Sequence, residues 1–120
     1  MAEPRVTVII ACYNDEEFIK KAIKSATNQD YQGSLTICVI NDGSTDSSWG
    51  LISPSGEGVI KDIFEGGDVL MSSDKKFIVI DRVNGGPSAA RNTGIRYTLE
   101  DTDIYAMLDA DDEMYPNKVQ

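Results

Sequence analysis

Three carboxylates near the end of the chain follow directly on an apolar run. Residues 104–108 read Ile-Tyr-Ala-Met-Leu, and Asp109, Asp111 and Asp112 come next, with one alanine between the first two. A continuous apolar run with β-prone residues is typical of a strand buried on both faces, which occurs mainly in parallel sheets. In an extended chain, residues two apart project to one side. Asp109 and Asp111 therefore suggest a site for a hard divalent cation.

The Asp-x-Asp pattern alone is weak evidence, because it arises easily by chance in so acidic a chain. The evidence for a site is the position of Asp109 and Asp111 in the chain. A second match, Asp101 and Asp103, precedes the same apolar run, and we interpret it as a solvated loop. In α/β sheets, ligands bind beyond the carboxyl ends of the strands. Asp109 and Asp111 lie at such an end.

Composition narrows the classes of ligand. A chain of 120 residues with 41% hydrophobic and 26% charged residues is typical of one globular domain. Its net charge of −9 argues against nucleic acid or an anionic membrane as a partner. A phosphorylated ligand would need a bridging cation. The absence of histidine excludes imidazole bases and metal ligands, and leaves carboxylates as candidate bases.

The two cysteines, Cys12 and Cys38, lie in apolar strand-like runs, so we interpret them as reduced core thiols rather than a disulfide. The apolar run at residues 6–12 is too short for a signal peptide or a membrane span. We therefore expect a cytoplasmic protein without a membrane span.

Four apolar runs predict four parallel strands, at residues 6–12, 35–40, 77–80 and 104–108. Their carboxyl ends would then lie on one rim of the sheet. The polar or flexible residues expected there are Tyr13, Asn14, Asp42, Asp46, Gly85, Gly86, Asp109 and Asp111. The sequence therefore predicts a single α/β domain over residues 1–120, with a mainly parallel sheet, flanking helices and a binding site at that rim.

Helix signals lie between these strands. Asn14 and Glu17 have the spacing of a capping box, and Ser88 is a candidate cap for a second helix. The apolar positions of the two helices are Phe18, Ile19, Ala22, Ile23 and Ala26, then Ala89, Ala90, Ile95 and Leu99. Pro116 predicts the start of a further helix.

The segment between residues 46 and 77 gives weaker signals. We expect a short helix around residues 49–52, and residues 60–64 allow another helical turn or two. Residues 69–71 are expected to form a hairpin with the strand at 77–80, through a turn at 73–76.

Four segments, in this order, resemble the family-two glycosyltransferases, which are inverting enzymes of the nucleotide-diphospho-sugar transferase fold. They are VIIACYN at 8–14, NDGSTD at 41–46, NGGPSAARNTG at 84–94 and LDADD at 108–112. The resemblance implies a Rossmann-like, GT-A type fold, truncated here, because it covers only the front, nucleotide-binding part of what the family usually has. The segment at 50–76 departs from the family in being longer than usual.

The resemblance also implies roles for individual residues. The nucleotide-binding residues would be Ala11, Tyr13, Asn14, Asp42, Arg91 and Asp109. Tyr13 would stack on or flank the base, and Asp42 would accept a hydrogen bond from it. A carboxylate accepts from uracil N3–H but faces an acceptor in cytosine, so Asp42 favours uridine or thymidine nucleotides. Asp111, with Asp109, would ligate Mn²⁺ or Mg²⁺ bridging the diphosphate.

Simpler roles remain open for three of these residues. Tyr13 could pack in the core, Asp42 could stabilise a turn, and Arg91 could form a surface ion pair.

The expected function is metal-dependent transfer from a nucleotide-diphospho-sugar, UDP-linked by preference, to a sugar, lipid or protein acceptor, with inversion. The catalytic base is expected beyond Gln120, so this chain would carry donor binding. One alternative is a nucleotide-sugar-binding module without catalysis. Another is a receiver-type signalling domain that binds Mg²⁺, although such a domain needs acids where Tyr13 and Asn14 stand.

Overall fold

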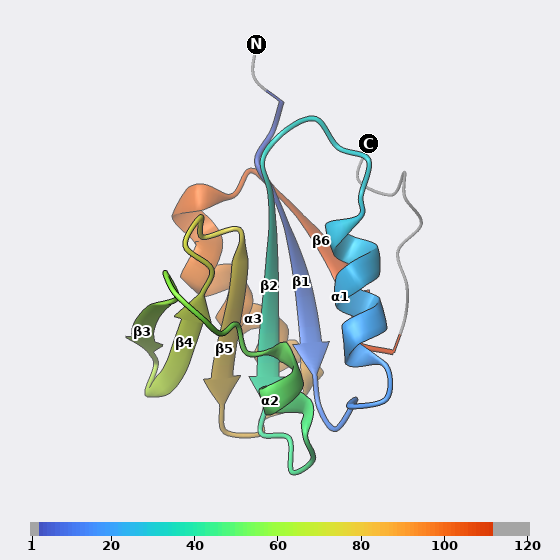
Figure 1. Ribbon diagram of the computed structural model, residues 1–120, viewed down its shortest axis with the longest axis vertical. Helices are drawn as coiled ribbons and strands as arrows, with labels where there is room; N and C mark the ends of the chain where they lie inside the picture. The colour runs from blue at the N-terminus through green and yellow to red at the C-terminus, as the bar shows by residue number, and fades with distance from the viewer. Residues whose placement is uncertain (1–2, 112–120) are drawn as a thin grey trace.

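The computed structural model describes residues 3–111, which form one sheet with helices on both faces (Figure 1). The strands are β1 (Val6–Cys12), β2 (Leu35–Asp42), β3 (Ile60–Phe64), β4 (Gly67–Met71), β5 (Phe77–Arg82) and β6 (Ile104–Asp109). The helices are α1 (Ile19–Thr27), α2 (Ser48–Ile52) and α3 (Pro87–Thr98), and α3 continues into the 3-10 turn η1 (Leu99–Asp101).

The strands within residues 3–111 lie in the order β3-β4-β5-β2-β1-β6. Strands β5, β2, β1 and β6 are mutually parallel, as the sequence predicts, and their carboxyl ends share one edge of the sheet. The predicted hairpin is also confirmed, because β4 pairs with β5 in antiparallel register. Ligands of such sheets bind beyond this edge, where β1, β2, β5 and β6 end.

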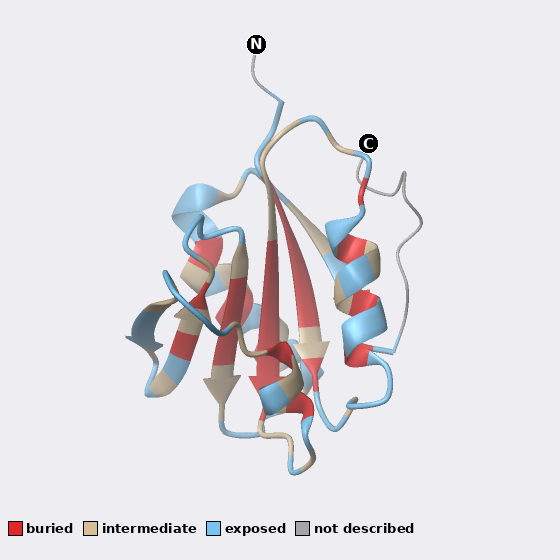
Figure 2. Cartoon of the chain, in the orientation of Figure 1, coloured by how far each residue is buried: buried red, intermediate tan, exposed pale blue. Residues whose placement is uncertain are grey.

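Two apolar layers, one on each face of the sheet, hold the helices. Alternate residues of β1, such as Ile10, face α1 and α2, while Ile9 and Ile40 face α3. Figure 2 shows that burial is concentrated on the central strands β1 and β2. Burying a side chain of this size stabilises the fold by about 1.5–3 kcal/mol. The β-branched residues that fill these strands favour extended backbone, so local propensity and burial agree.

Helix α3 lies close to the sheet because glycine occupies its contact point. A Cβ built on Gly94 would lie 2.6 Å from Ile40 Cδ1 and 3.1 Å from Ile9 Cδ1. Ile40 and Ile9 are fully buried. This contact fixes the height of α3 above the sheet. It thereby also fixes the position of Arg91, which lies one helical turn before Gly94.

The expectation that residues 104–108 are buried on both faces is wrong. β6 is an edge strand of the described sheet, and the side chains of Ile104 and Met107 are 51% and 38% exposed. The strand ends at Asp109, and Asp111 lies in the following turn. The backbone between the two acids is therefore not extended, contrary to what the prediction assumed.

Both predicted helix caps are also wrong. α1 begins at Ile19, and its cap position holds Phe18, which is 48% exposed, instead of Asn14. α3 begins at Pro87, after Gly86 with φ of 97°, a backbone angle that favours glycine. Ser88 therefore lies inside the first turn of α3.

Two further expectations fail, one at residues 60–64 and one at the end of α3. Residues 60–64 form strand β3, paired with β4, because the edge of the sheet satisfies their backbone. Leu99 lies beyond α3 and is 59% exposed, whereas Ala90, Thr93, Gly94 and Thr98 form the buried face. The helix predicted at Pro116 and the carboxylate of Asp112 lie outside the described residues. Within residues 3–111, no helix has the length and apolar character needed to cross a bilayer.

Candidate nucleotide-binding site

A cavity of about 540 Å³ opens at the carboxyl ends of the parallel strands. Its lining comes from the ends of β1, β2 and β6 and from the start of α3: Ala11, Cys12, Tyr13, Asp15, Asp42, Asn84, Gly86, Pro87, Arg91, Asp109, Ala110 and Asp111. The residues predicted for the nucleotide and the metal are therefore brought together in one cavity, with the exception of Asn14.

Asp42, the last residue of β2, is 2% exposed and is surrounded by donors from the turn before α3. Its Oδ1 accepts from the backbone N–H of Gly85 (3.0 Å), and its Oδ2 accepts from that of Gly86 (2.9 Å). The side-chain amide of Asn84 donates to Oδ2 at 3.3 Å and to the Asp42 carbonyl at 2.9 Å. Asp42 thus stabilises the turn before α3, which was its alternative role, and it also lines the cavity.

Arg91 and Asp109 form an ion pair in the lining of the cavity. Arg91 Nη2 donates to Asp109 Oδ1 at 2.8 Å, and the two side chains are 33% and 58% exposed. An ion pair this exposed contributes at most about 1 kcal/mol. Arg91 therefore forms an ion pair, as the alternative role predicted, but its partner is an acid of the cavity. A ligand that binds either side chain more strongly could break this ion pair.

Tyr13 is 49% exposed, so the alternative of core packing is wrong. Its backbone N–H donates to the carboxylate of Asp15 at 3.0 Å. Burial raises the pKa of Asp15, and the neighbouring carboxylates of Asp111, Asp46 and Asp109 raise it further. Several carboxylates therefore lie close together at the cavity, so an anionic ligand would need compensating positive charge.

Asn14 ties the loop after β1 to the loop after β2 and is absent from the cavity lining. It has φ of 52°, its N–H donates to Ser44 Oγ at 2.9 Å, and its Oδ1 accepts from Thr45 N at 2.7 Å. Three more bonds join the loops. Thr45 Oγ1 donates to Asn14 Oδ1 at 3.3 Å, Glu16 N donates to Asp46 Oδ2 at 3.2 Å, and Ser47 N donates to Glu16 Oε2 at 3.2 Å. The predicted contact of Asn14 with nucleotide stays a prediction.

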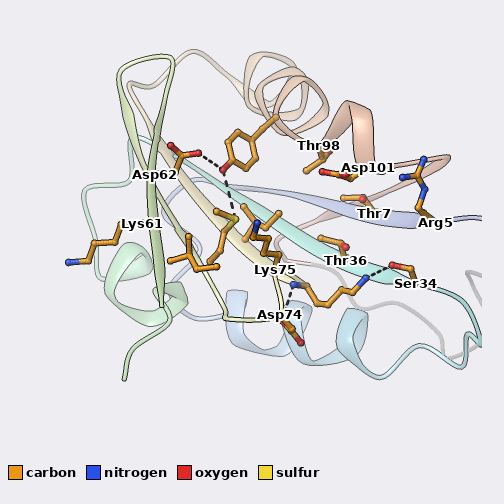
Figure 3. Close-up of a pocket in the computed structure, with 15 residues that line it drawn as sticks. Arg5, Thr7, Ser34, Thr36, Lys61, Asp62, Asp74, Lys75, Thr98 and Asp101 are labelled. Atoms are coloured by element: carbon orange, nitrogen blue, oxygen red, sulfur yellow. Dashed lines mark hydrogen bonds between the residues drawn. The ribbon is translucent and has the colours of Figure 1, made fainter. Parts of the chain in front are cut away.

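A second cavity, of about 570 Å³, lies at the opposite end of the sheet beneath the end of α3 (Figure 3). Thr7 of β1 and Thr36 of β2 line this cavity. Several of its polar groups already bond to one another: Lys76 donates to Ser34, and Tyr97 donates to Asp62 at 2.8 Å. It is slightly larger, but it lies away from the strand ends where ligands of such sheets bind. The cavity at the carboxyl ends is the better candidate site.

Family membership follows from the sequence itself. The model of the Glycosyl transferase family 2 matches residues 7–120. The chain belongs to this family. The receiver-type alternative is thereby excluded.

Relatives of this family 2 chain include the glycosyltransferase GlyA of Streptococcus pneumoniae, 32% identical over 100% of this chain and 16% of GlyA. The minor teichoic acid biosynthesis protein GgaA of Bacillus subtilis is 32% identical over 95% of this chain and 23% of GgaA. The chain thus spans less than a quarter of the length of either relative.

Solved structures of low identity share the fold of this family 2 chain. The S. aureus TarS 1-349 complex with UDP superposes with a TM-score of 0.70 at 20% identity, covering 96% of this chain and 30% of that one. The mannosyltransferase PcManGT from Pyrobaculum calidifontis, in complex with GDP-Man and Mn²⁺, has a TM-score of 0.64 at 24% identity, covering 92% and 28%. The GT-A type fold predicted from the sequence is confirmed.

Three polar residues in or next to the cavity of this family 2 chain were missed by sequence reasoning. Asp15 and Asn84 line it, and Arg82 contacts Asp42 from outside the lining. Asp15 and Asn84 follow strand ends, a position that could have marked them as candidates. Arg82 is itself the last residue of β5, but its contact with Asp42 depends on the register of β2 and β5, which the sequence does not reveal.

Proposed function

We propose that this chain binds the donor of an inverting, metal-dependent glycosyltransferase whose donor is a UDP-linked sugar. The observation that carries the proposal is the convergence of Tyr13, Asp42, Arg91, Asp109 and Asp111 on one cavity at the strand ends. An aromatic side chain, a buried acceptor, a cation and two acids match the parts of a nucleoside diphosphate. Family membership supports the same class of ligand.

Base recognition is assigned to Tyr13 and Asp42. The half-exposed ring of Tyr13 offers a stacking surface at the mouth of the cavity. The partners of Asp42 Oδ2, Gly86 and Asn84, line the cavity, whereas Gly85 and Arg82, the partners of Oδ1, do not. Uracil N3–H would therefore reach Oδ2 and displace the long 3.3 Å contact from Asn84, which keeps its bond to the Asp42 carbonyl.

The ribose and diphosphate are assigned to the other side of the cavity. In this proposal Asp109 leaves its ion pair with Arg91 and accepts from the ribose or joins the metal. The guanidinium of Arg91 is then free to donate to the diphosphate, for which its forked geometry is suited. The exposed ion pair costs little to break, so the exchange is energetically accessible.

The acids of the cavity fit a divalent cation. Mg²⁺ and Mn²⁺ prefer carboxylate oxygens and are commonly bound by one or two carboxylates together with substrate phosphates. Within the described part of the chain, no group of three or more metal-ligating side chains converges. Asp111 and Asp109 would therefore hold Mn²⁺ or Mg²⁺ jointly with the donor's diphosphate. The cation would neutralise charge that builds on the departing nucleoside diphosphate.

Inversion requires a base on the face of the sugar opposite the diphosphate. The described acids of the cavity have other partners, since Asp42 holds the turn, Asp109 pairs with Arg91, and Asp15 accepts from Tyr13 N–H. We assign the duty of the base to none of them. The acceptor, a sugar, a lipid or a protein, is likewise left unassigned.

Isothermal titration of the chain with UDP, CDP and GDP, with Mn²⁺ or with chelator, tests the proposal. We expect UDP to bind best and Mn²⁺ to strengthen its binding. Asp111→Asn should remove the Mn²⁺ effect, whereas Asp68→Asn, an exposed acid on β4, should leave it intact. Equal UDP affinity with Mn²⁺ and with chelator would refute the metal assignment. Failure of UDP to bind at all would refute the function.

A further inference from the structure

Arg82, the last residue of β5, lies beside Asp42 as its cross-strand partner in the parallel β2–β5 pair. Its side chain is 25% exposed and does not line the cavity. Arg82 Nε lies 3.3 Å from Asp42 Oδ1 and donates to the carbonyl of Val83 at 3.0 Å. The guanidinium thus contacts Asp42 from outside the lining of the cavity.

The same guanidinium reaches α3. Arg82 Nη1 donates to the carbonyl of Ala89 at 2.9 Å and to Thr93 Oγ1 at 2.6 Å. Thr93 is 2% exposed, so this bond anchors the guanidinium in the interior. Arg82 therefore connects the end of β2, the turn before α3 and the first turns of α3 through one rigid fork.

The two oxygens of Asp42 consequently have different partners. Oδ1 is held by Arg82 and the N–H of Gly85, neither of which lines the cavity. Oδ2 is left with partners at the cavity wall, Gly86 and Asn84. A carboxylate this deeply buried would otherwise have no compensating charge within an acidic site.

We propose that Arg82 is a specificity-determining positioning residue: by fixing Asp42 Oδ1 from outside the lining of the cavity, it presents Oδ2 to the nucleobase and so establishes the preference for uracil. This inference rests on the proposed function. It assigns to Arg82 no contact with the ligand.

Asp109 and Asp111, at the diphosphate and metal end of the cavity, lie on β6 and in the turn after it. Arg91 lies on α3, to which Arg82 also donates hydrogen bonds. The height of that helix is nevertheless set by the contact of Gly94 with Ile40 and Ile9. Binding at this end should therefore persist without Arg82.

The consequence of removing Arg82 is therefore specific to the base. In Arg82→Gln the fork and the charge are lost, so Asp42 can turn toward the vacated side and withdraw Oδ2 from the cavity. We expect the ratio of UDP to CDP affinity to fall about tenfold, as for loss of one charge-assisted bond. Arg82→Lys keeps the charge without the fork, and should retain part of the preference.

The test is a set of titrations with UDP, CDP and inorganic pyrophosphate, all with Mn²⁺, on the wild type, Arg82→Gln, Arg82→Lys and Arg96→Gln. Arg96 is the matched control, because it lies on α3 and pairs with exposed Glu65 (2.7 Å) outside the cavity. We expect a lowered UDP-to-CDP ratio in Arg82→Gln, unchanged pyrophosphate binding in every variant, and a wild-type ratio in Arg96→Gln.

The outcomes separate the inference from the function on which it rests. If the wild type prefers UDP but Arg82→Gln keeps the same ratio, the inference alone is overturned. Parallel losses of UDP, CDP and pyrophosphate binding would show that Arg82 serves only the fold. If Arg82→Gln does not fold, the test is made with Arg82→Lys. A wild-type UDP-to-CDP ratio in Arg82→Lys, which lacks the forked guanidinium, would contradict the positioning role of Arg82. A wild type without preference for UDP overturns both the function and the inference.

Discussion

Replacing Gly94 by alanine sets two effects of known size against each other. Alanine is favoured over glycine inside a helix by about 1 kcal/mol. The new methyl group, however, would lie 2.6 Å from Ile40 Cδ1 and 3.1 Å from Ile9 Cδ1, well inside the usual carbon–carbon distance of about 3.5–4.0 Å. Because both isoleucines are fully buried, neither can move aside freely. Overpacking of this kind costs about 1–3 kcal/mol, so we expect Gly94→Ala to lower the free energy of unfolding by about 1 kcal/mol.

Urea unfolding followed by circular dichroism measures this loss. The matched control is Gly50→Ala in α2, where an added Cβ has no atom within 4 Å. That substitution should stabilise the chain by about 0.4–1 kcal/mol, because only the propensity effect operates. If Gly94→Ala stabilised the chain as much as Gly50→Ala, the close contact of α3 with β1 and β2 would be refuted. A loss in Gly94→Ala should also weaken UDP binding, since α3 carries Arg91.

Three further outcomes are expected. Gly67→Ala should push the β3–β4 hairpin away from β5, because the added Cβ would overlap the carbonyl of Asp81 on β5. Gly66→Ala meets no atom within 4 Å and is disfavoured only by its φ of 80°, so limited proteolysis should distinguish the two variants. Burial raises the pKa of Cys12 to about 11 and that of Cys38 to about 12, so alkylation at pH 8 should require unfolding; a fast native reaction would contradict it. The neutral thiols stabilise the fold fully below their ordinary pKa of 9, and this contribution should be lost as pH rises through 11 to 12, which urea titrations across this pH range can measure.

The central sheet could be predicted because burial and local propensity agree there. The runs in β1, β2 and β5 contain β-branched residues that sit in the core of the structure. β3 could not, since Ile60 and Phe64 fit a helical repeat equally well, and only pairing with β4 makes them a strand. The cap predicted at Asn14 failed because its carboxamide bonds to Thr45, a partner 31 residues away.

Most of the site was predictable for a different reason. Parallel strands place their carboxyl ends on one edge, so Tyr13, Asp42 and Asp109 had to be neighbours once the strands were recognised. Arg82 ends a strand at the same edge, but its role could not be found in this way. Arg82 matters because it pairs with Asp42 on the neighbouring strand β2 and donates to Thr93 on α3. Neither contact can be read from the order of residues.

The hydrogen bonds that join the loops after β1 and β2 affect the cost of binding. In a cavity whose walls were separate mobile loops, a ligand would have to restrict their motion, and each ordered segment would reduce the affinity. Here Asn14 and Glu16 bond to residues 44–47 in both directions, so the two loops are fixed to each other by folding. The conformational entropy of this wall is lost before any nucleotide arrives, and contacts made there translate more fully into affinity.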